Sequence, residues 1–157
     1  MASKVLEELQ QRLAPTLGET SFAHETLVVH LPPAALLATV ALMRSEFGFD
    51  LFLDVTAVDW HGQTPRFEVV HHFYSTQHFE RVRLKTRVSE QDPTVDSLVP
   101  LYGSARFMER ECHDMYGIVF RGNADLRPIL LYEGFEGHPL RKDYPKDREQ
   151  PLVPYRK

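Results

Sequence analysis

Residues 81–88 of the chain read Arg-Val-Arg-Leu-Lys-Thr-Arg-Val, the clearest strand pattern in the sequence. Its basic residues alternate with Val, Leu and Thr at a period of two, the pattern of a β-strand that buries one face. We therefore predict a sheet with one covered face and one strongly basic face. A charge run of this kind is usually a solvated surface, and the alternative is a surface for an acidic partner.

Two further strands are predicted directly before this one. Residues 49–58 and 66–74 are rich in β-branched and aromatic residues, with turn signals at His61-Gly62 and at residues 75–78. Consecutive strands joined by short turns indicate an antiparallel meander.

The N-terminal third predicts two helices separated by a strand. Apolar residues recur at helical spacing from Val5 to Leu13, residues 24–31 have the pattern of a strand, and residues 34–47 carry a second apolar stripe. Gly48 is expected to end that second helix in the left-handed conformation.

The C-terminal half predicts a short helical turn over residues 92–98 and a helix over residues 105–116, which Ser104 caps and Gly117 ends. A short strand follows at residues 118–120. From Gly122 onward, glycine, proline and charged residues dominate, which indicates a loop and then an extended arm.

The fold class expected from these elements is α+β: a mixed, largely antiparallel sheet with helices packed on one face, over residues 1–133. Residues 134–157 form the extended C-terminal arm. Because the arm has no apolar stripe to bury, we expect it to gain its order from a partner. Removing it before Gly134 should then leave the melting temperature of the domain almost unchanged.

Composition excludes several functions. A net charge of −4 does not provide the basic surface that nucleic acids require, and the apolar run at residues 34–43 is about half the length that a bilayer requires. The N-terminus lacks the unbroken apolar core of a signal peptide. Cys112 is the only cysteine, so this chain cannot assemble an iron–sulfur cluster or a Cys-type zinc site alone.

The predicted helix at residues 105–116 concentrates the candidate chemistry in Glu109, Arg110, Glu111, His113 and Asp114. Their spacing matches neither a zinc protease nor a di-iron motif. The i,i+4 pairs Glu109–His113 and Arg110–Asp114 favour a structural role, and a buried Arg110 could also hold several loop carbonyls and carboxylates. A small metalloenzyme that uses Glu109, Glu111, His113 and Asp114 is kept as a further hypothesis.

Residues 107–118, Phe-Met-Glu-Arg-Glu-Cys-His-Asp-Met-Tyr-Gly-Ile, resemble the Glu-Arg-Glu-x-x-Asp-x-x-Gly-Ile core of the C-subunit family of NADH dehydrogenase, the NADH-quinone oxidoreductase of complex I. Residues 125–131 and 136–145 are similar to the rest of that family's signature. The chain departs from the family at Phe107, where a tryptophan is usual, at Asn123-Ala124, where His-Pro is usual, and at Pro128, where an arginine is usual. The residues that carry the signature, and that the resemblance marks as interface positions, are Glu109, Arg110, Glu111, Asp114, Gly117, Asp125, Leu126, Arg127, Gly137, His138, Pro139, Leu140, Arg141, Lys142, Asp143, Tyr144 and Pro145.

The resemblance implies a subunit without catalytic, cofactor-binding or metal-binding residues, in the peripheral arm of a proton-translocating NADH:quinone oxidoreductase. FMN and iron–sulfur clusters would be held by partner subunits. The arm would lie on the quinone-site (D-type) subunit and the cluster-bearing subunits, at the cytoplasmic face of the cell membrane. The equivalent subunit of an energy-converting hydrogenase or formate hydrogenlyase is the alternative.

Overall fold

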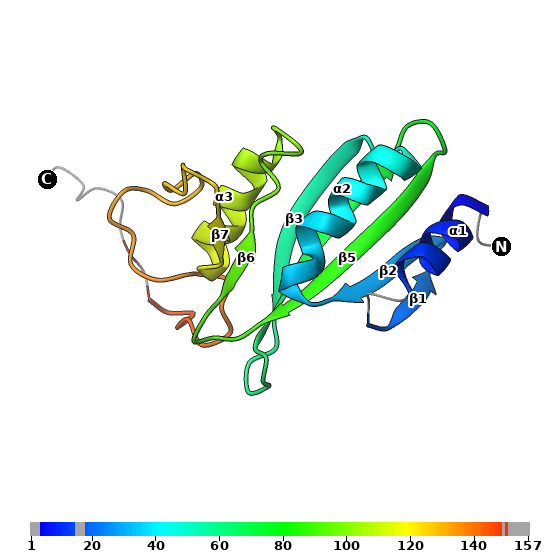
Figure 1. Ribbon diagram of the computed structural model, residues 1–157. Helices are drawn as coiled ribbons and strands as arrows, with labels where there is room; N and C mark the ends of the chain where they lie inside the picture. Colours follow the sequence, from blue (N-terminus) through cyan, green and yellow to red (C-terminus); the bar gives the residue numbers. More distant parts are fainter. Residues whose placement is uncertain (1–3, 15–17, 149, 151–157) are drawn as a thin grey trace, which may run out of the picture.

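The computed structural model describes residues 4–14, 18–148 and 150 (Figure 1). Seven strands, three α-helices and one 3₁₀ turn make up its regular structure. In chain order the elements are α1 (Lys4–Leu13), β1 (Thr20–Ala23), β2 (Thr26–Leu31), η1 (Pro33–Ala35), α2 (Leu36–Phe47), β3 (Leu51–Asp59), β4 (Phe67–Ser75), β5 (Glu80–Val88), β6 (Thr94–Asp96), α3 (Ala105–Tyr116) and β7 (Val119–Arg121).

Five strands form the main sheet in the order β1-β2-β5-β4-β3. The predicted meander is confirmed, because β3, β4 and β5 pair antiparallel in sequence order. β2 instead pairs parallel with β5, after the chain has crossed through α2. The sheet is therefore mixed and largely antiparallel, and the α+β fold class is confirmed.

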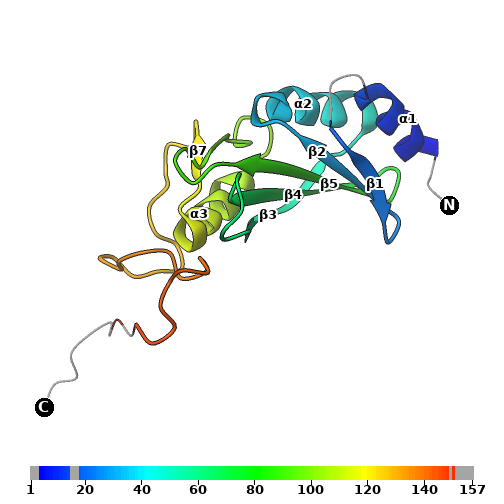
Figure 2. The ribbon, with the colours of Figure 1, turned by 90° about the horizontal axis from the view of Figure 1, so that it is seen from below.

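The two faces of the main sheet differ as the alternation in β5 predicts. Val82, Leu84 and Val88 point into the core, where α1 and α2 lie along the same side of the sheet (Figure 2). α3 lies beside the edge strand β3, and Cys112 and Tyr102 join the same core (Figure 1). Neither α1 nor α2 lies on the opposite face of the sheet, where the basic side chains of β5 point.

Two predicted elements differ from the structure. Residues 24–31 do not form one strand, because His24 and Glu25 adopt positive φ and make the turn of the β1–β2 hairpin. The sequence predicts a helical turn over residues 92–98, but Thr94–Asp96 form β6, which pairs parallel with β7. A strand of three residues is too short to show an alternating hydrophobic pattern, so β6 is recognised only by its pairing with β7.

The residues at the helix ends occupy the positions that the sequence predicts. Gly48 and Gly117 follow α2 and α3 in the left-handed conformation, with φ of +64° and +74°. Ser104 occupies the N-cap position of α3, but its side chain makes no capping hydrogen bond. No helix in the described ranges is long and apolar enough to cross a membrane.

Candidate functional site

The charged residues of α3 turn toward the loop that follows β7. Glu109 is fully buried and accepts hydrogen bonds from Ser97 Oγ at 2.7 Å, from the Leu98 amide at 2.7 Å and from Asn123 Nδ2 at 2.9 Å. Burial raises the pKa of Glu109, against the opposing effect of these donors. This carboxyl group therefore joins α3 both to the segment after β6 and to the start of the loop.

Arg110 joins α3 to the next part of the same loop. Its Nε donates to the Arg127 carbonyl at 2.9 Å and its Nη2 to the Pro128 carbonyl at 2.8 Å. Its Nη1 also lies 3.7 Å from Asp125, which accepts two hydrogen bonds from the Arg127 side chain. The bond from Arg127 lowers the pKa of Asp125 strongly. The predicted role of Arg110 in holding loop carbonyls and a carboxylate is confirmed.

Asp114 holds the third part of the loop. Its Oδ2 accepts hydrogen bonds from the amides of Ile129, Leu130 and Leu131, at 2.7, 3.0 and 3.3 Å. The carboxyl group is buried, so these three amides supply the polar partners that water would otherwise give it. The expected i,i+4 pairs of α3 are not what these residues form, because Glu109, Arg110 and Asp114 bond to the loop instead.

The arm covers the C-terminal end of α3. His138 Nδ1 donates to the Asp114 carbonyl at 2.9 Å, the Leu140 amide to the Met115 carbonyl at 3.2 Å, and Arg141 Nε to the Tyr116 carbonyl at 2.7 Å. A helix leaves its last carbonyls without partners within the helix, and a cation there also complements the helix dipole. Residues 138–141 therefore supply the hydrogen-bond donors that the last carbonyls of α3 lack within the helix.

Gly117 is the position where helix and arm come closest. A Cβ atom placed on it would lie 2.5 Å from Arg141 Nη2 and 2.5 Å from His138 Nε2. Its positive φ also disfavours any other residue. The glycine of the helix motif and the His and Arg of the arm motif thus form a single packed contact.

A second contact fastens the arm to the end of the sheet. Arg66 is 4% exposed and donates two hydrogen bonds of 2.8 Å to Asp59, and its Nη1 lies 2.5 Å from Glu90. It also donates to Asp143 at 2.8 and 3.0 Å, and the Lys142 amide donates to Asp59 at 2.8 Å. The bonds from Arg66 lower the pKa values of Asp59 and Asp143.

Aromatic packing extends both contacts. The guanidinium carbons of Arg66 and Arg141 lie 5.0 and 4.9 Å from the centre of the Phe67 ring. Further along, the rings of Phe135 and Tyr144 stack at 6.1 Å, and Gly137 leaves room for Tyr144, whose Cε2 would be 3.0 Å from an added Cβ.

These contacts correct the expectation for the arm. Residues 138–144 do not depend on a partner for all of their contacts, because they pack on α3, Asp59, Arg66 and Phe67 of the same chain. The reason is that charged side chains of the arm meet buried groups of opposite charge, which a search for apolar stripes does not detect. Residues 149 and 151–157 of the predicted arm lie outside the described residues.

The structure brings most of the signature together. Nine residues of the signature take part in the contacts above: Glu109, Arg110, Asp114, Gly117, Asp125, Arg127, His138, Arg141 and Asp143. Glu111, Lys142 and Pro145 are exposed, although the Lys142 amide is bonded, while Leu126 packs against the core. Sequence reasoning missed Arg66 and Glu90, because nothing near either residue in the sequence indicates a distant partner of opposite charge.

This arrangement fits a structural role, in which the side chains link segments of the chain, rather than a catalytic one. Of the four side chains in the metalloenzyme hypothesis, Glu109, His113 and Asp114 bond to different partners, and Glu111 is exposed. Within the described ranges, no three His, Cys, Asp or Glu residues are placed to hold a metal ion. Burial raises the pKa of the Cys112 thiol well above its usual range, which disfavours a nucleophilic thiolate.

Comparison with known sequences gives a consistent family. Residues 29–150 match the family model described as the 30 kDa subunit of respiratory-chain NADH dehydrogenase. The C subunit of the NADH-quinone oxidoreductase of Methylobacterium sp. (strain 4-46) is 40% identical over 146 residues, covering 89% of this chain and 67% of that protein. The corresponding C subunit from Geotalea uraniireducens is 35% identical and covers 94% and 92%.

Solved structures share the fold. The trypsin-resistant fragment (1-134) of Nqo5 aligns with a TM-score of 0.68 at 30% identity, over 78% of this chain and 97% of that one. A chain of the archaeal membrane-bound sulfane sulfur reductase aligns with a TM-score of 0.79 over 91% and 85%, at 24% identity, a likeness of fold alone.

Proposed function

This chain belongs to the family of the 30 kDa subunit of respiratory-chain NADH dehydrogenase and is a subunit of an NADH:quinone oxidoreductase, and we propose that its role in the peripheral arm is structural. Relatives 35 and 40% identical are named as C subunits of NADH-quinone oxidoreductase. That name favours this host over the hydrogenase and formate hydrogenlyase alternative.

The observation that carries this proposal is where the charged side chains of the signature point. Glu109 bonds to the Leu98 amide after β6 and to Asn123 at the start of the loop, and Arg110 and Asp114 bond to backbone groups of that loop. A catalytic acid or base needs a reacting group within hydrogen-bonding distance and a suitable pKa. Here those positions are occupied by loop amides and carbonyls, which supports a role in fixing the shape of the loop.

The chemistry of the complex then belongs to other subunits. Electron transfer from NADH to quinone needs a flavin and iron–sulfur clusters, and a cluster needs several converging thiolates, while this chain has one cysteine. We place FMN and the clusters in partner subunits and none in this chain. Elemental analysis for iron and zinc and an absorption spectrum of the purified chain test this, and a stoichiometric metal or flavin would contradict it.

The loop that Asp114 holds offers a surface for a partner. Leu130 is 62% exposed and Leu140 is 52% exposed, although their neighbours are tightly bonded to α3. An exposed leucine on a rigid support is available for contact with a partner. We propose that this loop and the arm, residues 134–157, dock on the quinone-site (D-type) subunit and the cluster-bearing subunits, at the cytoplasmic face of the cell membrane.

The experiment is a co-purification from the organism that carries the gene. An affinity-tagged chain should bring down the quinone-site subunit, and deletion of the gene should abolish NADH:quinone oxidoreductase activity in membranes. Leu130→Glu should retain the melting temperature of the isolated chain, because the side chain is exposed, and should reduce the amount of co-purified partner. Full activity in the deletion strain would contradict the proposed function.

A further inference from the structure

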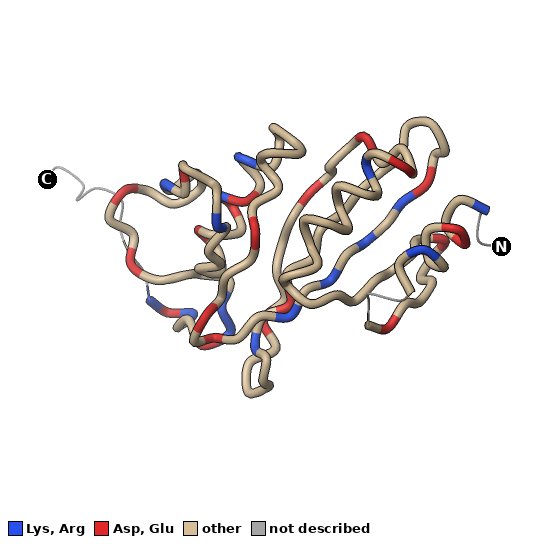
Figure 3. Tube along the Cα trace, viewed as in Figure 1, with Lys and Arg blue, Asp and Glu red and all other residues tan. Residues whose placement is uncertain are grey.

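The face of the sheet opposite α1 and α2 carries a row of cations along β5. Arg81, Arg83, Lys85 and Arg87 point to this face, spaced roughly 6.6 Å apart as alternate residues of a strand. The row is visible as repeated blue segments along β5 in Figure 3. The face contrasts with the chain as a whole, whose net charge is −4.

The stems of these side chains lie on the sheet. Val28 and Val70 face the same side and are 4% and 5% exposed, although neither α1 nor α2 lies there. Long basic side chains can bury their methylene groups on an apolar surface while the charged ends stay accessible. The cations are therefore partly fixed in place, which lowers the entropy lost when they bind an anion.

The two ends of the row differ in charge balance. Lys85 Nζ lies 2.7 Å from Glu68, and Arg87 Nε lies 3.7 Å from the same carboxyl group. Glu68 is 2% exposed and also accepts a hydrogen bond from Trp60 at 2.9 Å. This single carboxylate offsets one of the two positive charges at this end of the row.

At the other end, two carboxyl groups, Glu25 and Glu80, line the neighbouring hollow, but among the described residues neither forms an ion pair with the row. Arg81 and Arg83 form no ion pair there, and the Nε atom of Arg83 is buried without a hydrogen-bond acceptor. Across β4, Arg83 faces His72 and Arg81 faces Tyr74, neither of which is an anion. Asp54 lies on β3, beyond His72 of β4, so its Cα atom is two strand spacings, roughly 10 Å, from that of Arg83.

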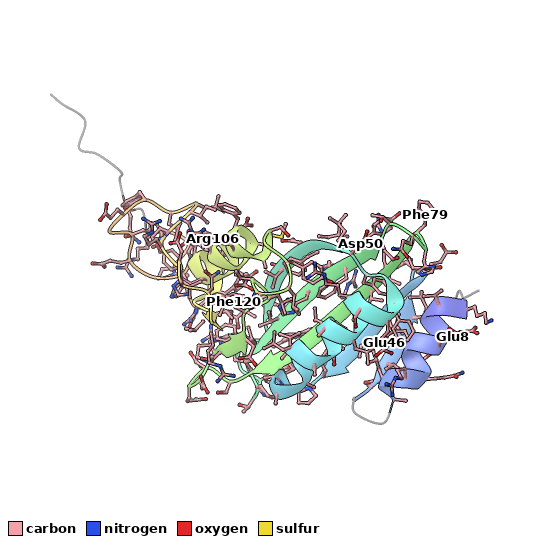
Figure 4. All side chains as sticks on the ribbon, turned by 45° about the horizontal axis from the view of Figure 1, so that its top comes forward. Glu8, Glu46, Asp50, Phe79, Arg106 and Phe120 are labelled. Carbon is pink, nitrogen blue, oxygen red and sulfur yellow. The ribbon has the colours of Figure 1, made fainter. Side chains whose placement is uncertain are left out.

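A hollow and an exposed aromatic ring lie beside Arg81 and Arg83. The hollow has a volume of about 450 Å³ and is lined by Arg81, Arg83, the β1–β2 turn and Phe79. Phe79 is 76% exposed and stands at the tip of the β4–β5 hairpin (Figure 4). Two guanidinium groups without an ion-pair partner and an exposed ring thus lie beside one hollow.

We propose that Arg81 and Arg83, with Phe79 beside them, bind an acidic segment of a neighbouring subunit in the complex, an inference that rests on the proposed function. Carboxylates of the segment would pair with the two guanidinium groups, and an apolar side chain would contact Phe79. Glu25 and Glu80 line the same hollow. They disfavour a continuous anionic surface such as a membrane, whereas a peptide segment can place its carboxylates away from them.

The test compares two double charge reversals in a tagged full-length chain. Arg81→Glu/Arg83→Glu removes the proposed site, and Lys4→Glu/Arg12→Glu changes the net charge equally on α1, across the sheet. The amount of complex that co-purifies should fall about tenfold for the first variant and stay at the wild-type level for the second, since a close charge pair at an interface contributes about that much or more. The neutral Arg81→Gln/Arg83→Gln variant, with melting curves for all chains, separates binding from folding.

The outcomes are distinct. If the wild-type chain brings down no complex, the proposed function fails. If it does and both reversals match it, or both lose the complex equally, this inference fails while the proposed function stands. Wild-type binding to phosphatidylglycerol vesicles that Arg81→Glu/Arg83→Glu abolishes would identify a lipid surface and also overturn it. A photo-crosslinking amino acid at position 79 should capture a peptide rich in Asp and Glu, and capture of a neutral or basic peptide would contradict the inference.

Discussion

Arg66 and Asp143 are 77 residues apart in the sequence, yet their guanidinium and carboxylate groups share two hydrogen bonds of 2.8 and 3.0 Å. Arg66 lies directly before β4 and is buried, while the Asp143 side chain is 45% exposed. The pair fixes the arm to the sheet beside Asp59, so the second half of the family signature acts on the α+β domain of the same chain.

Asp143→Asn should lower the free energy of unfolding by about 1–2 kcal/mol, because it weakens charge-assisted bonds that are partly exposed to solvent. The loss stays modest since Asp59 still pairs with Arg66. Urea unfolding of the full chain measures it. Asp147→Asn, at an exposed position in the same arm, is the matched control and should have no effect. Equal free energies of unfolding for both variants would show that the contact between Asp143 and Arg66 does not stabilise the fold.

Gly117→Ala should lower the free energy of unfolding by roughly 1–3 kcal/mol and loosen the arm, because the new methyl group strains a positive φ and meets His138 and Arg141. Limited trypsin digestion should then cut faster at Arg141 and Lys142. Gly103→Ala is the control, since an added Cβ there meets nothing within 4 Å. Unchanged cleavage in Gly117→Ala would argue against a joint between helix and arm.

Arg110→Ala should damage assembly rather than turnover. It leaves the Arg127 and Pro128 carbonyls without a donor and removes a positive charge beside Asp125, a change of about 1–3 kcal/mol. The amount of assembled complex in membranes should fall, while activity per assembled complex stays at the wild-type level. Arg12→Ala, on the exposed side of α1, is the control. Normal amounts of a complex with lost turnover would indicate a catalytic role instead.

His71→Phe should flatten the pH dependence of stability in acid. His71 is fully buried in the core beside Phe52 and Phe73, and burial lowers its pKa to about 3. The unfolded chain takes up a proton at this residue below pH 6.5, which the folded chain does not take up until about pH 3. Stability is therefore lost as the pH falls through this window, by up to about 1.4 kcal/mol per pH unit.

Unfolding at several pH values between 7 and 4 measures that slope, which should be smaller in His71→Phe than in the wild type. Phe73→Leu, which alters the ring beside His71 but removes no titratable group, is the control and should keep the wild-type slope. A slope unchanged in His71→Phe would show that the histidine is already charged in the folded chain.

The elements that depend on local periodicity can be predicted from the amino-acid sequence. The alternation in residues 81–88 reports which side chains share a face, and the meander before it follows from short turns between strands. Gly48 and Gly117 end their helices as expected, because a left-handed residue is needed where each helix stops. These features depend on neighbours within a few residues, so a single sequence contains them.

The partner of each charged residue, in contrast, depends on how distant segments of the chain pack together. Spacing suggested Arg110–Asp114 and Glu109–His113 pairs within α3, yet Asp114 bonds to amides at residues 129–131 and Glu109 to Ser97. The same holds for Arg66 with Asp143, and for the arm that packs on its own domain. Hydrogen bonds and ion pairs join whatever the folded chain brings within about 3 Å. The path that returns residues 123–144 to α3 and to the end of the sheet is set by the whole fold rather than by any local repeat.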